Sequence, residues 1–372
     1  MNSAPARRLK VAIVAPSLHI LGGQAVQADR LLTQWRNDSE VDAWLVPINP
    51  RLAGAARRLQ ELKYVRTVVT QLAYWPLLVR ELRHADVVHV FSASYFSFVL
   101  SPWPAVHVAR ALGKPVVFNY HSGEAPDHLQ RSALARRTLR AADVNVVPSR
   151  FLQEVFAGFR IPALVIPNIV DLRRFQFRER RPLRPHLVST RNFEPMYNVA
   201  CTLRAFAIVQ SRVPDARLTL AGFGSQDAAL RRLASDLGLR HVTFTGRVQP
   251  DAMPAVYASG DLYVQTPRID NMPMSVLEAF ASGTPVVSTD VGGVPAMLTD
   301  RVHGRLAPDD DHQAVAVSIV ELLEHPDHAL ELARHARSAC DAYTWDVTRA
   351  QWLSAYRSTL ERAEVAGAPV VA

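Results

Sequence analysis

Cysteine and lysine are both scarce in this chain of 372 residues. The two cysteines, Cys201 and Cys340, lie far apart, so they provide neither a disulfide framework nor the spacing of a metal site. We therefore expect a reducing cytosol and no metal. Lysine occurs only at Lys10, Lys63 and Lys114, so arginine supplies nearly all the positive charge.

Long hydrophobic runs are also missing. No stretch approaches the ~20 apolar residues of a membrane span, and the richest, 87–109, is interrupted by histidine, serine and proline. The apolar run 11–15 follows basic residues as in a signal peptide, but it is short and ends at Pro16. We interpret it as a buried first strand.

Hydrophobic residues make up 49% of the chain and charged residues 20%, which is typical of a globular protein with two domains. The net charge of +8 is unevenly distributed. Residues 1–160 carry 20 Lys and Arg against 11 Asp and Glu (+9), whereas residues 161–372 carry 22 against 23 (−1). The basic first half indicates an anionic partner there, whether membrane surface, phosphorylated acceptor or nucleic acid.

Two successive halves alternate buried-strand and helix patterns. Strands are predicted at 11–15, 43–48, 87–91, 116–120, 144–147 and 164–166, and again at 186–189, 218–221, 242–245, 262–265 and 286–288. Such alternation favours parallel sheets covered by helices, with ligands at the carboxyl ends of the strands in a cleft between the halves. The charged segment 175–185, with two prolines, is interpreted as an interdomain linker.

The most informative segment is TPRIDNMPMSVLEAFASGTPVVSTDVGG at 266–293. Asp270 lies eight positions before Glu278, Asn271 and Pro273 suit a helix start, and Gly283 suits a helix stop before a strand. Carboxylates at a helix start can accept hydrogen bonds from sugar hydroxyls, while the helix amides favour a diphosphate. The alternative is that Asp270 caps the helix and Glu278 is a solvated acid.

This segment resembles the signature of glycosyltransferase family 4, in which two glutamates separated by seven residues hold a nucleotide sugar. Here Asp270 replaces the first glutamate. The resemblance implies a GT-B fold: an α/β architecture of two doubly wound, Rossmann-like domains facing across a cleft. We place these domains at 1–172 and 186–345, with a C-terminal helix, 350–366, packing back on the first.

The resemblance also implies site residues outside this segment. Gly22 and Gly23 match the N-terminal glycine loop, and His121 matches a histidine near the transferred sugar, although an ordinary loop histidine is the alternative. Arg191 matches a diphosphate-binding arginine, but the lysine usual six residues later is missing. Turns near the nucleotide are matched by further residues, namely Gly222, Gly224, Arg247 and Val248.

The activity implied is transfer of a sugar, with retention, from a nucleotide diphosphate sugar to a glycan or lipid-linked acceptor in envelope or exopolysaccharide synthesis. Arg191, His121 and Asp270 would be catalytic, Glu278 would bind the ribose, and no cofactor or metal would be needed. A sugar-nucleotide epimerase and a weakly active nucleotide-sugar-binding subunit are the alternatives. Nucleic acid is not expected as a partner, because no recognition motif accompanies the basic charge.

A basic and aromatic stretch runs from Arg51 to Arg83. Mixed cations and aromatic residues suit attachment to an anionic membrane, here the inner face of the cell membrane. The alternative is a pair of amphipathic helices whose apolar faces belong to the core.

Overall fold

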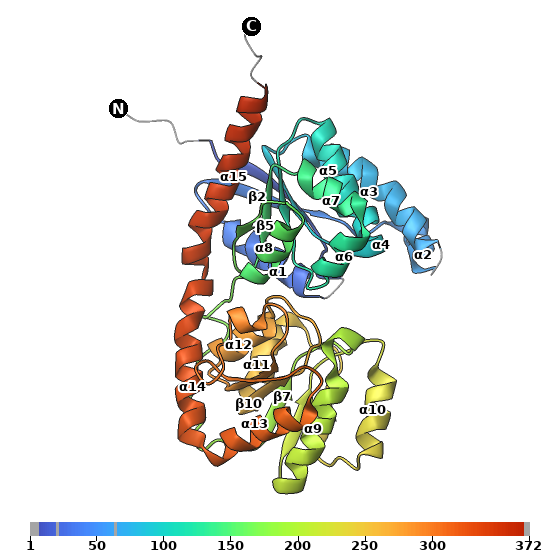
Figure 1. The fold of residues 1–372 in the computed structure, drawn as a ribbon. Coiled ribbons are helices and arrows are strands. Elements are labelled where there is room, and N and C mark those ends of the chain that lie inside the picture. The colour runs from blue at the N-terminus through green and yellow to red at the C-terminus, as the bar shows by residue number, and fades with distance from the viewer. Residues whose placement is uncertain (1–6, 20–21, 63–64, 368–372) are drawn as a thin grey trace. The chain divides into compact units, whose positions relative to one another are not determined.

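A computed structural model describes residues 7–19, 22–62 and 65–367 of the chain. The chain divides into two compact units (Figure 1): unit 1 comprises Met1–Ile169 with Thr348–Ala372, and unit 2 comprises Val170–Val347. Each unit holds one six-stranded sheet whose strand pairs are all parallel.

The sheet of unit 1 has the strand order β2-β1-β3-β4-β5-β6. Its strands are β1 (Leu9–Ala15), β2 (Val41–Pro47), β3 (Val87–Phe91), β4 (Val116–Asn119), β5 (Val144–Val147) and β6 (Leu164–Val165). The helices are α1 (Gly23–Trp35), α2 (Gly54–Glu61), α3 (Arg66–Leu82), α4 (Tyr95–Leu100), α5 (Pro102–Ala111), α6 (Ala125–Arg131), α7 (Ala133–Ala141) and α8 (Arg150–Gly158). Most residues of β3, β4 and β5 are buried apolar side chains, as expected for a parallel sheet covered on both faces.

The last helix, α15 (Trp345–Gly367), returns the chain to unit 1. Arg349 donates to Asp38 at 2.6 Å and to Glu40 at 2.9 Å. Burial alone would raise the pKa of Asp38, but the Arg349 cation and the backbone amides of Glu40 and Val41 together outweigh burial and lower that pKa. Further along α15, the Tyr356 hydroxyl lies 2.9 Å from Nδ1 of the buried His89 in β3. Ion pairs and a buried polar contact therefore fix the helix to the sheet.

The sheet of unit 2 has the order β12-β11-β10-β7-β8-β9. Its strands are β7 (His186–Ser189), β8 (Arg217–Leu220), β9 (Val242–Phe244), β10 (Leu262–Gln265), β11 (Val286–Thr289) and β12 (Arg305–Ala307). The helices are α9 (Val199–Arg212), α10 (Asp227–Asp236), α11 (Met253–Ser259), α12 (Met274–Ala281), α13 (His312–Glu324) and α14 (Pro326–Ala339). The strand order reverses between β7 and β10, which is the position where doubly wound sheets bind ligands.

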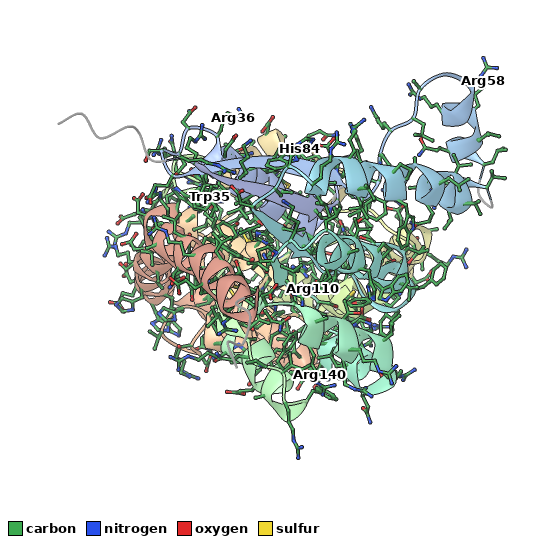
Figure 2. The ribbon with its side chains drawn as sticks, turned by 90° about the horizontal axis from the view of Figure 1, so that it is seen from above. Trp35, Arg36, Arg58, His84, Arg110 and Arg140 are labelled. Carbon is green, nitrogen blue, oxygen red and sulfur yellow. The ribbon has the colours of Figure 1, made fainter. Side chains whose placement is uncertain are left out.

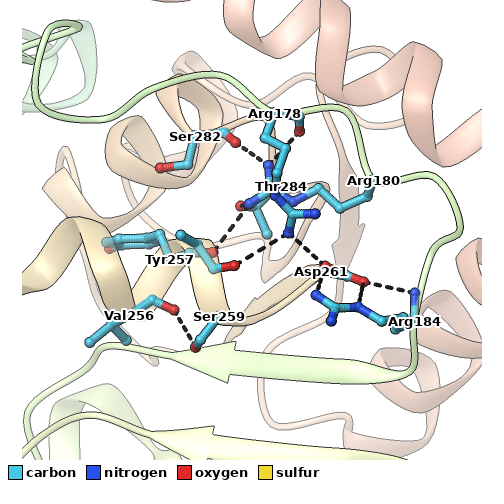
Figure 3. A network of polar contacts seen from close by, with 10 residues as sticks. Arg178, Arg180, Arg184, Val256, Tyr257, Ser259, Asp261, Ser282 and Thr284 are labelled. Carbon is cyan, nitrogen blue, oxygen red and sulfur yellow. Dashed lines mark hydrogen bonds and ion pairs between the residues drawn. The ribbon is translucent and has the colours of Figure 1, made fainter.

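The interpretation of 175–185 as a linker is wrong, because this segment packs within unit 2. Figure 3 shows Arg180 reaching into a network of polar contacts, where it donates to the Thr284 hydroxyl at 2.9 Å and the Tyr257 carbonyl at 3.2 Å. Nearby, Arg184 forms bonds of 2.7 and 3.0 Å with the fully buried Asp261. Burial lowers the pKa of Arg180 to about 10, and the surrounding acceptors compensate the buried cation.

The predicted strands agree with the structure to within two residues at each end, but β12 was missed. This strand is three residues long and contains Arg305, which pairs with Asp300 and Glu321, so its sequence lacks an apolar run. Among the described residues, no helix combines the length and apolar character that crossing a membrane would require.

Candidate functional site

Arg191 and Asp270 meet at the point where the sheet of unit 2 reverses its strand order. Arg191 follows β7 and Asp270 follows β10, and these strands are neighbours. Arg191 Nη2 donates to Asp270 Oδ2 at 2.6 Å, and the two side chains are only 10% and 13% exposed. Two residues that the sequence separates by 79 positions therefore form a mostly buried ion pair.

Other contacts fix the Arg191 guanidinium from different directions. Nη1 donates to the Ser275 hydroxyl at 2.9 Å, and Ser275 in turn donates to Gln265 at 3.0 Å. Arg191 Cζ lies over the Tyr197 ring, 4.0 Å from the ring centroid. Burial lowers the pKa of Arg191, but the negative charge of Asp270 and the neighbouring Tyr197, Tyr257 and Tyr263 together outweigh burial and raise it. The side chain is thus a permanent cation held in one orientation.

Two glycines set the position of the Asp270 loop. A Cβ atom on Gly292 would lie 2.1 Å from the Asp270 carbonyl oxygen, and one on Gly293 would lie 2.0 Å from that of Asn271. Gly293 N also donates to the Asp270 carbonyl at 3.1 Å. Only glycine permits this approach of two backbones. The carboxylate is oriented as well, because Asn271 N donates to Asp270 Oδ1 at 2.8 Å.

Glu278 lies one turn into α12 and is buried, with 7% of its surface exposed. The alternative of a solvated helix acid is therefore wrong. The pKa of the neighbouring Tyr257 is raised well above its usual value, first by burial and then by the charge of Glu278. The Tyr257 hydroxyl also contacts Thr190 at 2.8 Å and the Ser275 carbonyl at 3.1 Å, so it links Glu278 to the loop that carries Arg191. Of the two residues predicted to suit the helix start, Pro273 is the N-cap of α12 (Met274–Ala281), and Asn271 lies in the preceding loop.

The Gly222-x-Gly224 turn after β8 packs against the same Arg191 loop. A Cβ on Gly222 would lie 2.1 Å from the Arg191 carbonyl oxygen, and one on Gly224 would lie 2.5 Å from that of Phe193. The turn therefore positions the loop through its backbone. The Arg247 guanidinium lies over the Phe223 ring at 4.3 Å.

The residues predicted in unit 1 follow β1 and β4. Gly22 is the N-cap of α1 and Gly23 its first residue, and a Cβ on either would meet no atom within 4 Å. Unlike Gly222, Gly224, Gly292 and Gly293 of unit 2, this pair is not packed against another backbone.

His121 follows β4, and its ring stacks on Phe91 with centroids 5.3 Å apart. Both rings line a small pocket of unit 1 with Asn119, Asn168 and Trp352. Burial lowers the pKa of His121 to about 4, so the imidazole is neutral at neutral pH.

Sequence reasoning did not identify His89 beneath this pocket. It is fully buried in β3, with Asn119 Nδ2 3.0 Å from Nε2 and the Tyr356 hydroxyl 2.9 Å from Nδ1. Burial, followed by the neighbouring His121, lowers the pKa of His89 to about 3. The sequence signal that could have identified His89 was a histidine in the middle of an apolar strand. Within the described ranges, no group of three or more His, Cys, Asp or Glu side chains could hold a metal ion.

Family models match both parts of the chain. A model described as Glycosyltransferase Family 4 matches residues 21–174, and one described as Glycosyl transferases group 1 matches residues 184–325. A GDP-mannose-dependent phosphatidylinositol monomannoside mannosyltransferase of Mycolicibacterium smegmatis is 31% identical over 261 residues, covering 63% of this chain and 68% of the relative. The chain belongs to glycosyltransferase family 4. The sulfoquinovosyl transferase of Arabidopsis thaliana is 26% identical over 308 residues, covering 76% of this chain and 59% of that protein.

Solved structures show that this family 4 chain has the GT-B fold. Sucrose-phosphate synthase from Thermosynechococcus elongatus superposes with a TM-score of 0.73 at 19% identity, covering 95% of this chain and all of that one. Anabaena HepE in complex with UDP-glucose gives 0.72 at 18% identity, covering 94% and 100%. The protein is thus a glycosyltransferase of the GT-B type.

Proposed function

We propose that the protein is a retaining glycosyltransferase that transfers a sugar from a nucleotide diphosphate sugar to an acceptor hydroxyl. The observation that carries this proposal is the Arg191–Asp270 pair at the strand reversal of unit 2, with the buried Glu278 one turn into the adjoining helix. A fixed cation beside two carboxylates suits a ligand that is anionic at one end and rich in hydroxyls at the other.

Each residue has a distinct role in this proposal. Glu278 accepts hydrogen bonds from the ribose hydroxyls. Asp270 accepts bonds from the sugar, because each carboxylate oxygen has a second lone pair beyond those used by Arg191 and Asn271. Arg191 stabilises the charge that grows on the diphosphate as the bond to the sugar breaks. In unit 1, the amides of Gly22 and Gly23 at the start of α1 bind phosphate and the neutral His121 contacts the sugar.

The chemistry requires no enzyme nucleophile. The acceptor oxygen forms a bond to the anomeric carbon on the face from which the diphosphate leaves, and the acceptor proton passes to the departing phosphate oxygen. The anomeric configuration is thereby retained. The acceptor in this proposal is an envelope glycan or a lipid-linked sugar, reached by reversible attachment of the basic unit 1 to the inner face of the cell membrane. A relative that acts on a phosphatidylinositol mannoside supports this choice.

Hydrolysis of a panel of nucleotide sugars, beginning with GDP-mannose and UDP-glucose, tests the proposal. With an active donor in hand, NMR of the product made from an acceptor panel gives the anomeric configuration. We expect release of the nucleoside diphosphate and an unchanged configuration. Inverted product would refute retention, and conversion of one nucleotide sugar into another would identify an epimerase. Binding of donors without any turnover would identify a binding subunit.

A further inference from the structure

Helix α3 of unit 1 presents a second apolar face that the core of the unit does not cover. One face is buried, with Tyr74, Leu78 and Leu82 all fully inaccessible in the core cluster. The other face is exposed: Val68 is 60%, Leu72 72% and Val79 48% accessible. Val65 and Trp75, at 37% and 39%, complete a row with helical spacing, here called the α3 stripe. From Val65 to Val79 the stripe is about 21 Å long.

The α3 stripe lies in a segment with an excess of cations. Residues 51–83 contain seven Arg and Lys against two Glu, a balance of +5, and the exposed Arg58 and Arg66 lie on α2 and at the start of α3. Figure 2 shows Arg58 projecting from the outer end of the helical hairpin that α2 and α3 form. The one described acid on α3, Glu81, is paired with Arg80 at 2.8 Å. The surface thus combines aliphatic side chains with a net positive charge.

Trp75 adds the chemistry of a lipid–water boundary. Its ring makes an edge contact with Trp103 of α5 at 6.1 Å, which anchors one side while the other remains exposed. Partly exposed tryptophans are enriched where acyl chains meet headgroups. Two observations therefore agree, an amphipathic row of aliphatic residues beside cations and an aromatic ring in the same row.

We propose that the α3 stripe docks unit 1 on an anionic lipid membrane, with Val68, Leu72 and Val79 entering the headgroup region and Arg58 and Arg66 contacting lipid phosphates. A second copy of the chain fits this surface less well, because self-association would bring two +5 segments together. The inference deepens the proposed function by assigning membrane attachment to specific side chains. It does not depend on which donor or acceptor is used.

Co-sedimentation of the full chain with phosphatidylcholine vesicles, with and without phosphatidylglycerol, tests the proposal. We expect binding to the anionic vesicles that weakens as salt is added. Leu72→Asp should reduce the partition coefficient about tenfold or more, because it replaces an apolar side chain that would be buried in the lipid by a charged one. The matched control Val317→Asp on α13, where Val317 is 54% exposed, should have no effect. The double variant Arg58→Gln, Arg66→Gln should weaken anionic binding about tenfold or more, whereas Arg232→Gln on α10 should not.

Several results would overturn this inference. No preference for anionic vesicles at low salt, or equal partition of Leu72→Asp and Val317→Asp, would exclude the stripe as a lipid-docking surface. Concentration-dependent dimers in analytical ultracentrifugation that Leu72→Asp abolishes would assign the surface to self-association instead. UDP and GDP binding by each variant, measured by calorimetry, reports on the fold and the nucleotide site independently of vesicle binding. Loss of vesicle binding with intact nucleotide binding therefore concerns this surface alone, and failure of the proposed enzyme activity would leave it unaffected.

Discussion

Replacing Asp270 by asparagine removes the charge that compensates Arg191 while keeping the shape of the side chain. The Arg191 side chain, which is only 10% exposed, would then lack an anionic partner, since Ser275 and the Tyr197 ring are neutral. Breaking a buried ion pair from one side costs about 3–5 kcal/mol, because the remaining charge stays desolvated. Both side chains keep a little water contact and two neutral contacts survive, so we expect a loss of about 2–3 kcal/mol.

Thermal unfolding measured by calorimetry would detect this loss. For a domain of 150–250 residues, each kcal/mol shifts Tm by about 2–4 °C, so the transition of unit 2 should fall by about 4–12 °C. Asp270→Glu keeps the charge and should retain most of the stability. The control is Asp227→Asn, which breaks an exposed pair with Arg231 and should cost at most about 1 kcal/mol. Equal shifts for Asp270→Asn and Asp227→Asn would refute the reasoning that Asp270 holds Arg191 in place.

Three further predictions concern catalysis, binding and pH. Arg191→Ala should remove about 2–4 kcal/mol of transition-state stabilisation, which lowers kcat with little change in KM. A decrease in kcat of less than about threefold at saturating donor would exclude Arg191 as the leaving-group cation. Glu278→Gln should abolish calorimetric binding of the nucleotide, with circular dichroism as the fold control; unchanged affinity would refute the ribose assignment. His89 and His121 have pKa values of about 3 and 4 in the folded chain, below the ordinary 6.5, so both rings must be neutral for unit 1 to be stable. The contribution of the two neutral rings to the free energy of unfolding is fully present above pH 6.5. It decreases as the pH falls, by at most about 2 kcal/mol for each ring at pH 5. A Tm that is constant from pH 7 to 5 would contradict this.

Strand positions and the loops that follow them could be predicted from the sequence, because short apolar runs, most of them next to glycine or proline, leave few alternatives. The Asp270 and Glu278 spacing likewise predicted a helix after a loop. The partner of Asp270 could not be predicted, since the contact with Arg191 depends on two strands that are adjacent only through the reversed order of the sheet.

Burial of charged residues was the main source of error. Arg180 lies in a segment whose composition is typical of a linker, yet it is 3% exposed because carbonyls from separate elements accept its bonds. The sequence also did not show which apolar residues of α3 are exposed, because the residue type is the same whether the side chain faces the core or the solvent. In both cases the tertiary environment, which periodicity does not report, decided the outcome.

The four glycines behind Arg191 and Asp270 have a consequence for how this site can change. Gly222, Gly224, Gly292 and Gly293 contact backbone atoms, and any side chain at these positions would overlap a neighbouring carbonyl oxygen or, at Gly224, also the Glu194 carboxylate. The backbone contacts at these glycines therefore fix the shape of the loops that carry Arg191 and Asp270. New donor preferences must arise from side chains that face the ligand, and substitutions at the four glycines would impair every donor alike.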